Sequence, residues 1–402
     1  MTGKALYRST PTKHAATSFV VLLGILSLLS DMTYEGARSI TGPFLAALGA
    51  SGTILGLVAG AGELLGYGLR VISGYVSDKT GRYWTITFVG YFLNLLAVPA
   101  LAFAGRWQVA AALMLIERTG KAIRNPARDA MLSHATSRLG HGWGFALHEA
   151  MDQIGAVSGP LLVALVVSSQ REYRPAFLVL LIPAIMAVTV LTAARIVYPR
   201  PRDFEQASPA QTGPKPMSRQ FWLYIAAVGL VAAGYADFPL IAFHLRKTTD
   251  IKDSLIPLMY ALAMGVDAIA ALFFGWLFDR IKIGSLAIAI MLSSLFAPLS
   301  FLGDLNLAFF GVALWGIGMG AQESILRAVI AGMVPPDRRG TAFGFFNGGY
   351  GLAWFAGSAL MGLLYDLSIP ALVAFSVGAQ ILAVVVLARV ATAQSKAGTQ
   401  AP

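Results

Sequence analysis

Twelve mainly apolar stretches follow one another along the chain, each with the roughly 20 residues that an α-helix needs to cross a bilayer. Charged residues make up 12% of the 402 positions, about half of the roughly 25% found in soluble domains. The sequence therefore predicts an all-α membrane protein with 12 transmembrane helices. They cover about residues 17–47, 52–77, 83–104, 108–132, 142–168, 175–197, 219–246, 254–278, 284–302, 304–333, 340–364 and 369–391.

One connection differs from the short turns between the other segments. Residues 198–218 read YPRPRDFEQASPAQTGPKPMS, a polar, proline-rich composition typical of a flexible linker. We expect it to separate an N-terminal six-helix bundle, residues 1–197, from a C-terminal six-helix bundle, residues 219–402. Lysine and arginine are about three times as frequent on the linker side of the predicted helices as on the other side, which predicts a multi-pass protein of the cytoplasmic (inner) membrane with both termini in the cytoplasm.

The two halves resemble each other at an offset of about 200 residues. GYVSDKTGRYW (74–84) follows the second apolar segment, and GWLFDRIKIGS (275–285) follows the eighth. In the same way, GWGFALHEAMDQIGAVSGPLL in the fifth segment parallels TAFGFFNGGYGLAWFAGSALM in the eleventh. This duplication predicts two bundles related by a pseudo-two-fold axis, with a substrate site between them near the midplane of the bilayer.

The loop after the second segment resembles the signature loop of the major facilitator superfamily (MFS), with the pattern Gly-x-x-x-Asp-Lys-x-Gly-Arg over residues 74–82. The one departure is Tyr83, which stands where a second basic residue is usual. The resemblance implies a secondary transporter that works by alternating access, and a loop that holds the outward-facing state closed at its inner end. The alternative is a basic loop that only sets the topology. The residues concerned are Gly74, Asp78, Lys79, Gly81 and Arg82.

A second pattern, Gly155-x-x-x-Gly159-Pro160, resembles the antiporter-type motif of drug and metabolite exporters. Val163 and Ala164 replace the glycine pair usual there, and Met114 stands at the place of the exporter-type arginine of the fourth helix. The resemblance to the superfamily therefore covers the whole chain as far as architecture is concerned. The motif that would indicate the direction of transport is only half present.

The first apolar segment carries three ionisable residues in its middle. Asp31, Glu35 and Arg38 are spaced i, i+4 and i+7, which places all three on one face of a helix. Charged groups inside a bilayer are costly and face the protein interior or water. We expect this face to line a hydrated path between the bundles, with Glu35 paired to Arg38; the alternative is an ion pair that only fixes helix packing.

The fourth segment carries a longer charged stripe that runs toward the cytoplasmic side. The fifth segment, antiparallel to it, has acidic residues at matching depth, so we expect Arg124 and Arg128 to pair with Glu149 and Asp152, and Arg70 to join them. Such a network can be structural, gating or proton-carrying. The stripe consists of Glu117, Lys121, Arg124 and Arg128, with Arg118 beside it.

Other ionisable residues are expected near mid-depth. An acid at this depth is suited to carrying a proton because burial disfavours its charged form; Asp31, Glu35 and Glu63 are the leading candidates. Glu323 and Arg327, spaced i, i+4, are expected to pair. The candidate residues for proton coupling or substrate binding are Asp31, Glu35, Arg38, Glu63, Asp237, Glu323 and Arg327, and Asp267 lies at similar depth. Trp315, Tyr67 and Tyr350 either stack on a substrate or fill gaps between helices.

These features predict a proton-coupled antiporter that exports a small organic molecule. The alternatives are an uptake symporter or facilitator for a small anion, zwitterion or metal chelate, and a divalent-metal exporter. The chain contains no cysteine, which excludes disulfides, thiolate metal sites and thiol nucleophiles. We expect no enzymatic activity, no cofactor, no resident metal and no nucleic-acid partner. The expected partners of this chain, a monomer, are its substrate, protons and the lipid bilayer.

Overall fold

The computed structural model describes residues 13–136, 141–201, 217–334 and 339–398, and in these ranges it contains helices and no strand. The N-terminal half holds α1 (Lys13–Ala47), α2 (Gly52–Thr80), α3 (Tyr83–Ala100), the 3-10 helix η1 (Leu101–Phe103), α4 (Trp107–Thr136), α5 (His141–Gln170), α6 (Tyr173–Val179) and α7 (Leu181–Val197). The C-terminal half holds α8 (Arg219–Ala233), α9 (Phe238–Thr248), α10 (Leu255–Ile281), α11 (Ile283–Ser293), α12 (Phe296–Phe301), α13 (Leu305–Met333), α14 (Arg339–Leu367) and α15 (Ile369–Gly398).

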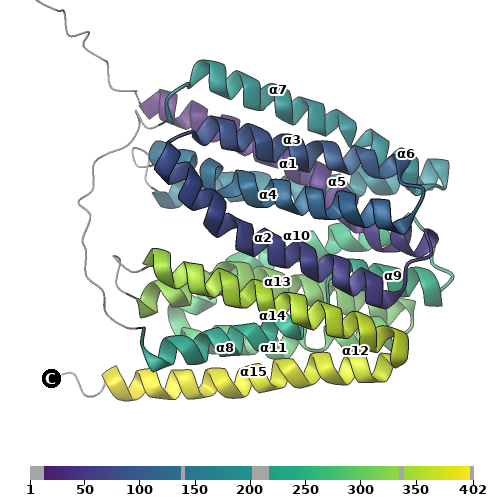
Figure 1. Ribbon diagram of the computed structural model, residues 1–402. Coiled ribbons are helices and arrows are strands. Elements are labelled where there is room, and N and C mark those ends of the chain that lie inside the picture. The colour runs from purple at the N-terminus through teal and green to yellow at the C-terminus, as the bar shows by residue number, and fades with distance from the viewer. Residues whose placement is uncertain (1–12, 137–140, 202–216, 335–338, 399–402) are drawn as a thin grey trace, which may run out of the picture.

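The all-helical membrane fold is confirmed, whereas the count of twelve spans stays a prediction. Ten spans in the described ranges are long and apolar enough to cross a membrane. The α4 and α14 helices are equally long but do not reach that hydropathy. In Figure 1, α1–α7 lie together on one side and α8–α15 on the other. The pseudo-two-fold symmetry stays a prediction, and most of the predicted linker lies outside the described residues.

The helices run roughly along one direction, so the molecule has two ends (Figure 1). We call the end that holds the start of α1, the last turn of α2 and residues 198–201 the linker end. The opposite end, where α1 finishes and α2 begins, is the far end. If the positive-inside prediction holds, the linker end faces the cytoplasm.

Glycines let helices within each half approach closely. A Cβ on Gly155 or Gly159 would collide with the carbonyl oxygens of Leu28 or Met32, because α5 lies directly against α1. The antiporter-type pattern of α5 is therefore a packing surface in this structure. Gly90 and Gly120 bring α3 and α4 together in the same way.

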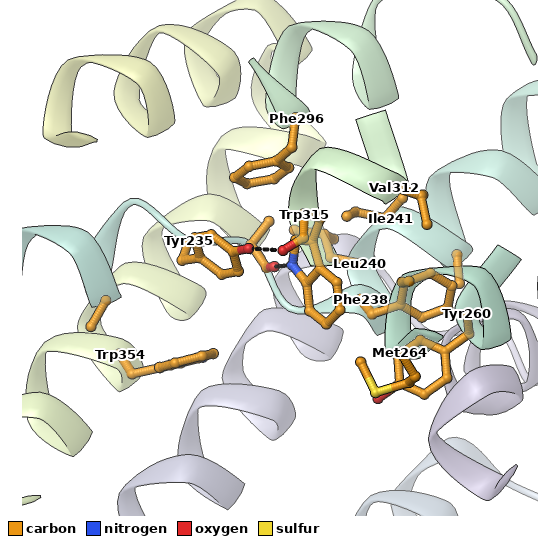
Figure 2. Close-up of a cluster of buried hydrophobic side chains, with 14 of the residues drawn as sticks. Tyr235, Phe238, Leu240, Ile241, Tyr260, Met264, Phe296, Val312, Trp315 and Trp354 are labelled. Atoms are coloured by element: carbon orange, nitrogen blue, oxygen red, sulfur yellow. Dashed lines mark hydrogen bonds between the residues drawn. The ribbon is translucent and has the colours of Figure 1, made fainter. Parts of the chain in front are cut away.

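The seventh predicted span is broken into α8 and α9 at residues 234–237. Pro239 at the start of α9 fits this break, because proline suits the first turn of a helix and lacks the N–H that a continuous helix would need. The break is held by the aromatic cluster in Figure 2, where the Trp315 indole donates to the carbonyl of Ala236 at 2.8 Å and Phe238 packs on Tyr260 with 4.4 Å between ring centroids. This packing fixes the position of Asp237 between the halves.

The two halves are tightly joined at the far end. A Cβ on Gly56 would collide with the carbonyl oxygen of Ser358, and one on Gly42 with that of Pro239. Beyond them, the Asp366 carboxylate at the end of α14 accepts hydrogen bonds from the first residues of α2: the Gly52 amide at 2.9 Å, and the Thr53 amide and hydroxyl at 2.7 and 2.6 Å. A residue of the C-terminal half therefore caps a helix of the N-terminal half.

Toward the linker end, α2 and α14 separate. Tyr67 and Tyr350 still meet near mid-depth, with 5.1 Å between ring centroids. On the linker side of this pair, added Cβ atoms at Gly68, Gly344 and Gly348 would meet nothing within 4 Å. The described residues therefore form a structure that is closed at the far end and opens toward the linker end.

Candidate functional site

Nine of the ionisable residues predicted to face the interior form one group at mid-depth, where α1, α2 and α4 approach the break between α8 and α9. Seven of them are linked by contacts of 4.0 Å or less, and the Asp31–Arg124 pair lies beside them. The acids and bases of this group alternate, so each charge has an opposite neighbour, as buried charges require. The members are Asp31, Glu35, Arg38, Glu63, Glu117, Arg118, Lys121, Arg124 and Asp237. We call this set the central network.

Arg38 joins the two halves. Its guanidinium donates to the Asp237 carboxylate at 3.2 Å, across the interface between α1 and the start of α9. Asp237 is only 3% exposed and also accepts hydrogen bonds from the Trp354 indole at 3.0 Å and the Ser358 hydroxyl at 3.1 Å. The contact of Arg38 with Glu35, 4.0 Å, forms as predicted but is the longest in the group.

Glu63 on α2 lies between two arginines. Arg118 of α4 reaches it at 2.9 Å, and Arg38 of α1 lies 3.8 Å from the same carboxylate oxygen. Arg118 is in turn 3.9 Å from Glu117. Glu63 therefore links the charges of α4 to the arginine that holds Asp237.

Glu35 makes a second link between the halves. The hydroxyl of Tyr260, on α10, donates to the Glu35 carboxylate at 2.5 Å, and Lys121 lies 3.8 Å from its other oxygen. Lys121 also sits over the ring of Tyr34, 3.6 Å from its centroid, a cation–π arrangement. Glu35 is thus held by residues of both halves.

Arg124 is fully buried and faces α1 and α3, so its predicted pairing with Glu149 or Asp152 is wrong. Its guanidinium lies 3.6 Å from Asp31 and over the Tyr91 ring at 4.4 Å. The physical reason is the close approach of α3 and α4 at Gly90 and Gly120, which turns this part of α4 away from α5.

Arg128 also differs from the prediction. It pairs with its neighbour Asp129 at 2.8 Å and donates to the Ser27 hydroxyl at 2.7 Å. Asp152 instead lies 3.6 Å from His148, and the Glu149 side chain is exposed. Arg70 forms no ion pair within 4.0 Å among the described residues, and its guanidinium lies over the Tyr67 ring at 5.0 Å.

The predicted ion pair on α13 does not form: among the described residues, no contact within 4.0 Å joins Glu323 to Arg327. Both side chains are exposed on the part of α13 nearer the linker end. Asp267 on α10 is buried and accepts a hydrogen bond from Gln153 of α5 at 3.4 Å, a third polar link between the halves.

The loop pattern of residues 74–82 lies at the linker end, away from the central network. Gly81 ends α2 with a positive φ of 66°, the left-handed conformation that glycine adopts without strain. Asp78 accepts a hydrogen bond from Tyr83 at 3.3 Å, Lys79 lies over the Tyr75 ring at 5.6 Å, and Gly74 packs near Pro126. Arg82 precedes the first residue of α3. A gating role for this loop stays a prediction.

Several residues of the site have no signal in the sequence patterns. Tyr260, Trp354 and Ser358 hold the inter-half carboxylates, and Asn94 donates its amide to Glu117. They are neutral residues in apolar segments, so charge patterning overlooks them. Trp315 is fully buried and fills a gap between helices, while Tyr67 and Tyr350 contact each other. Among the described residues, no group of three or more His, Asp or Glu side chains could hold a metal ion.

The fold, the network at the seam of two halves and the broken span point to one family of transporters. The sequence profile of the Major Facilitator Superfamily matches residues 23–358 and, in a second overlapping match, residues 238–401. The chain belongs to the major facilitator superfamily. The resemblance to this superfamily is thereby confirmed.

Relatives of this MFS transporter cover nearly its whole length. An uncharacterized protein of Mycobacterium tuberculosis is 41% identical, over 95% of this chain and 96% of the relative. The Multidrug resistance protein MdtH of Photorhabdus laumondii is 25% identical, over 83% and 84%. A crystal structure of the nucleoside transporter NupG superposes with a TM-score of 0.71 over 92% of this chain and 98% of that one; at 13% identity, this similarity concerns the fold alone.

Proposed function

We propose that this MFS member is a proton-coupled antiporter that exports a small organic molecule across the cytoplasmic membrane, with both termini in the cytoplasm. One observation carries the proposal: two polar links that join the halves at mid-depth, Arg38–Asp237 and Tyr260–Glu35, both end on buried carboxylates. A proton bound to either carboxylate would remove the charge that holds the other half.

The arrangement supports coupling for a physical reason. A buried carboxylate needs either a cationic partner or a proton, because an uncompensated charge inside a membrane protein is costly. Separation of the halves at the far end takes Arg38 from Asp237. Proton uptake at Asp237 then stabilises the separated state, so the opening of the far end and the binding of a proton favour each other.

The closed far end and the open linker end support alternating access. With the linker end in the cytoplasm, the structure is the inward-facing state, in which a cytoplasmic compound reaches the central network. The export direction is supported by the glycine-proline pattern at residues 155–160 and by the 25% identity to a protein named for multidrug resistance.

The proposal is tested in energised inverted vesicles with a pH-sensitive dye. The probe compounds are ethidium, norfloxacin and fosmidomycin, one cation, one zwitterion and one phosphonate anion. We expect at least one of them to dissipate the proton gradient in vesicles that contain the wild type. Asp237→Asn should abolish this response, because an amide neither binds the proton nor carries the charge that Arg38 needs.

Glu172→Gln is the matched control, since Glu172 is an exposed acid at the far end, outside the central network. It should respond like the wild type. An unchanged response of Asp237→Asn would refute the assignment of this carboxylate. A gradient that only builds faster with the probe would identify symport in place of antiport.

A further inference from the structure

A cavity adjoins the central network on its far-end side, mainly within the N-terminal half and bounded by the start of α9. Its walls are apolar and come from α2, α3, η1 and α4, with Val58, Val98, Leu101 and Met114 among them. Acids of both halves reach this space. Its polar lining is formed by Tyr34, Arg38, Thr41, Glu117, Arg118 and Asp237.

The size of the cavity fits water. It has room of about 40 Å³ for the centres of water molecules, and one buried water needs roughly 10–15 Å³ by this measure. It therefore accommodates roughly three water molecules, and no organic compound of drug size.

Two of the lining residues have buried donors that lack a protein partner. The hydroxyl of Tyr34 and the Nε of Arg38 make no hydrogen bond within the described residues. A buried donor left without an acceptor costs free energy, and such groups in proteins are satisfied by ordered water. The cavity supplies the space, and the two donors supply polar partners for the water.

We propose that this cavity holds a chain of water molecules that connects Glu117 with Asp237, and that Glu117 is the residue that passes protons to Asp237. The inference rests on the proposed function. A proton leaves the Glu117 carboxyl for the nearest water, the last water gives a proton to the Asp237 carboxylate, and the Arg38–Asp237 bond breaks. Glu117 remains as a carboxylate, with Arg118 at 3.9 Å as its counter-charge.

Polar and charged neighbours of Glu117 and Asp237 influence this proton transfer. Asn94 of α3 donates its amide to Glu117, an interaction that persists whether or not the acid carries a proton. The ionisable groups that face Glu117 are Arg118, Lys121 and Arg124 of its own helix and Tyr34 and Glu35 of α1. Those that face Asp237 are Arg38 of α1, Glu63 of α2 and Arg118 of α4.

Hydration is tested first, by hydroxyl-radical footprinting of the full-length protein in nanodiscs, a measurement that does not depend on transport. Radicals generated from bound water should oxidise Tyr34 and Met114 faster than Tyr224 and Met131. Tyr224 is buried with its hydroxyl bonded to the carbonyl of Leu326, and Met131 is fully buried on the same helix as Met114. Equal, slow oxidation of all four would overturn the hydrated cavity.

A pair of variants makes this measurement specific. Val58→Phe fills the cavity and should remove the excess oxidation of Tyr34. Leu57→Phe places the same phenyl ring on the outer surface of α2, where Leu57 is 44% exposed, and should leave the oxidation unchanged. Retained oxidation in Val58→Phe would place the water elsewhere.

The relay is tested with the probe compound that the wild type exports. Glu117→Gln and Val58→Phe should both lose the dissipation of the proton gradient. Val58→Phe should keep exchange of the labelled probe at equal pH, which moves no net proton, and measurable exchange in Glu117→Gln would show that this variant is folded. Leu57→Phe should retain both activities, and Glu117→Asp should regain part of the coupling.

The outcomes separate the two proposals. Full coupling in Glu117→Gln beside a coupled wild type overturns the relay alone and leaves the proposed function standing. A wild type that moves protons with none of the probes overturns the proposed function and the relay together, while the footprinting still decides whether the cavity is hydrated.

Discussion

At the scale of single residues, Arg38 contacts more acids than any other base of the central network, and one of them, Asp237, belongs to the other half. It lies within 4.0 Å of Glu35, Glu63 and Asp237, three acids on three different elements. An arginine suits this place because its planar guanidinium offers several donors at once and stays charged when buried.

Removal of Arg38 should therefore destabilise the protein. We expect Arg38→Leu to lower the free energy of unfolding by about 3–5 kcal/mol, because it leaves Asp237 buried without its counter-charge. Chemical denaturation in detergent, followed by circular dichroism, measures the change. Addition of Asp237→Leu should recover part of the loss.

Arg106→Leu serves as the control for this prediction. Arg106 is exposed in the turn between η1 and α4, so its loss should change the unfolding free energy by no more than about 0.5 kcal/mol. If the losses of Arg38→Leu and Asp237→Leu simply add in the double variant, the two residues do not act as a pair.

At the scale of elements, the closure of the far end depends on how α2 and α14 meet. Small residues bring the two backbones together, and the Asp366 carboxylate then caps the first turn of α2. Burial raises the pKa of Asp366, but the hydrogen bonds from Thr53 and Gly52 outweigh it and hold the pKa below its ordinary value. The cap is therefore fully present at neutral pH.

The cap predicts a change in amide exchange. Asp366→Ala should weaken the first turn of α2 by about 1 kcal/mol, the usual loss for a helix cap, and peptides that contain Gly52 and Thr53 should exchange hydrogen faster. In the wild type, the pKa of Asp366 is lowered. The cap therefore keeps its full strength as the pH falls to the ordinary pKa of an aspartate, and it is lost as the pH falls further through the lowered pKa of Asp366.

Asp304→Ala is the matched control for the cap. Asp304 accepts a hydrogen bond from the Leu307 amide at the start of α13, within its own half, at 2.9 Å. It should speed exchange in α13 and leave α2 unchanged. Identical exchange of α2 in Asp366→Ala and in the wild type would show that this carboxylate does not hold the far end.

At the scale of the whole molecule, the closed far end and the open linker end predict reciprocal motion. The chain has no cysteine, so spin labels can be attached at chosen pairs without background. We expect the distance between labels at Arg106 and Asn306 to increase, and that between labels at Val76 and Ile281 to decrease, when acid pH or a transported probe favours the other state. Double electron–electron resonance measures both distances.

The pair Arg106/Ile196 joins the two ends of the N-terminal half, and Ile196 is 74% exposed on α7. It should keep its distance and report that this half moves as a unit. Parallel changes at the two ends, both increasing or both decreasing, would contradict alternating access and indicate loosening of the whole structure.

Much of this architecture is readable from the sequence because helix periodicity and bilayer thickness act on each segment separately. Apolar runs of membrane-spanning length indicate the spans, and the i, i+4, i+7 spacing of Asp31, Glu35 and Arg38 places them on one face. The expectation that this face turns inward agrees with the structure, where Glu35 is 8% exposed and Asp31 and Arg38 are partly buried.

Only the tertiary structure decided which charges meet and which end is closed. Arg38 and Asp237 are 199 positions apart, and Arg124 faces Asp31 where the sequence favoured acids of the fifth segment. Periodicity determines the face of a helix, whereas the partner depends on the rotation and depth at which two helices pack. These are set by glycine contacts such as Gly90 against α4 and Gly56 against α14, and by the break before Pro239, which brings Asp237 to the seam.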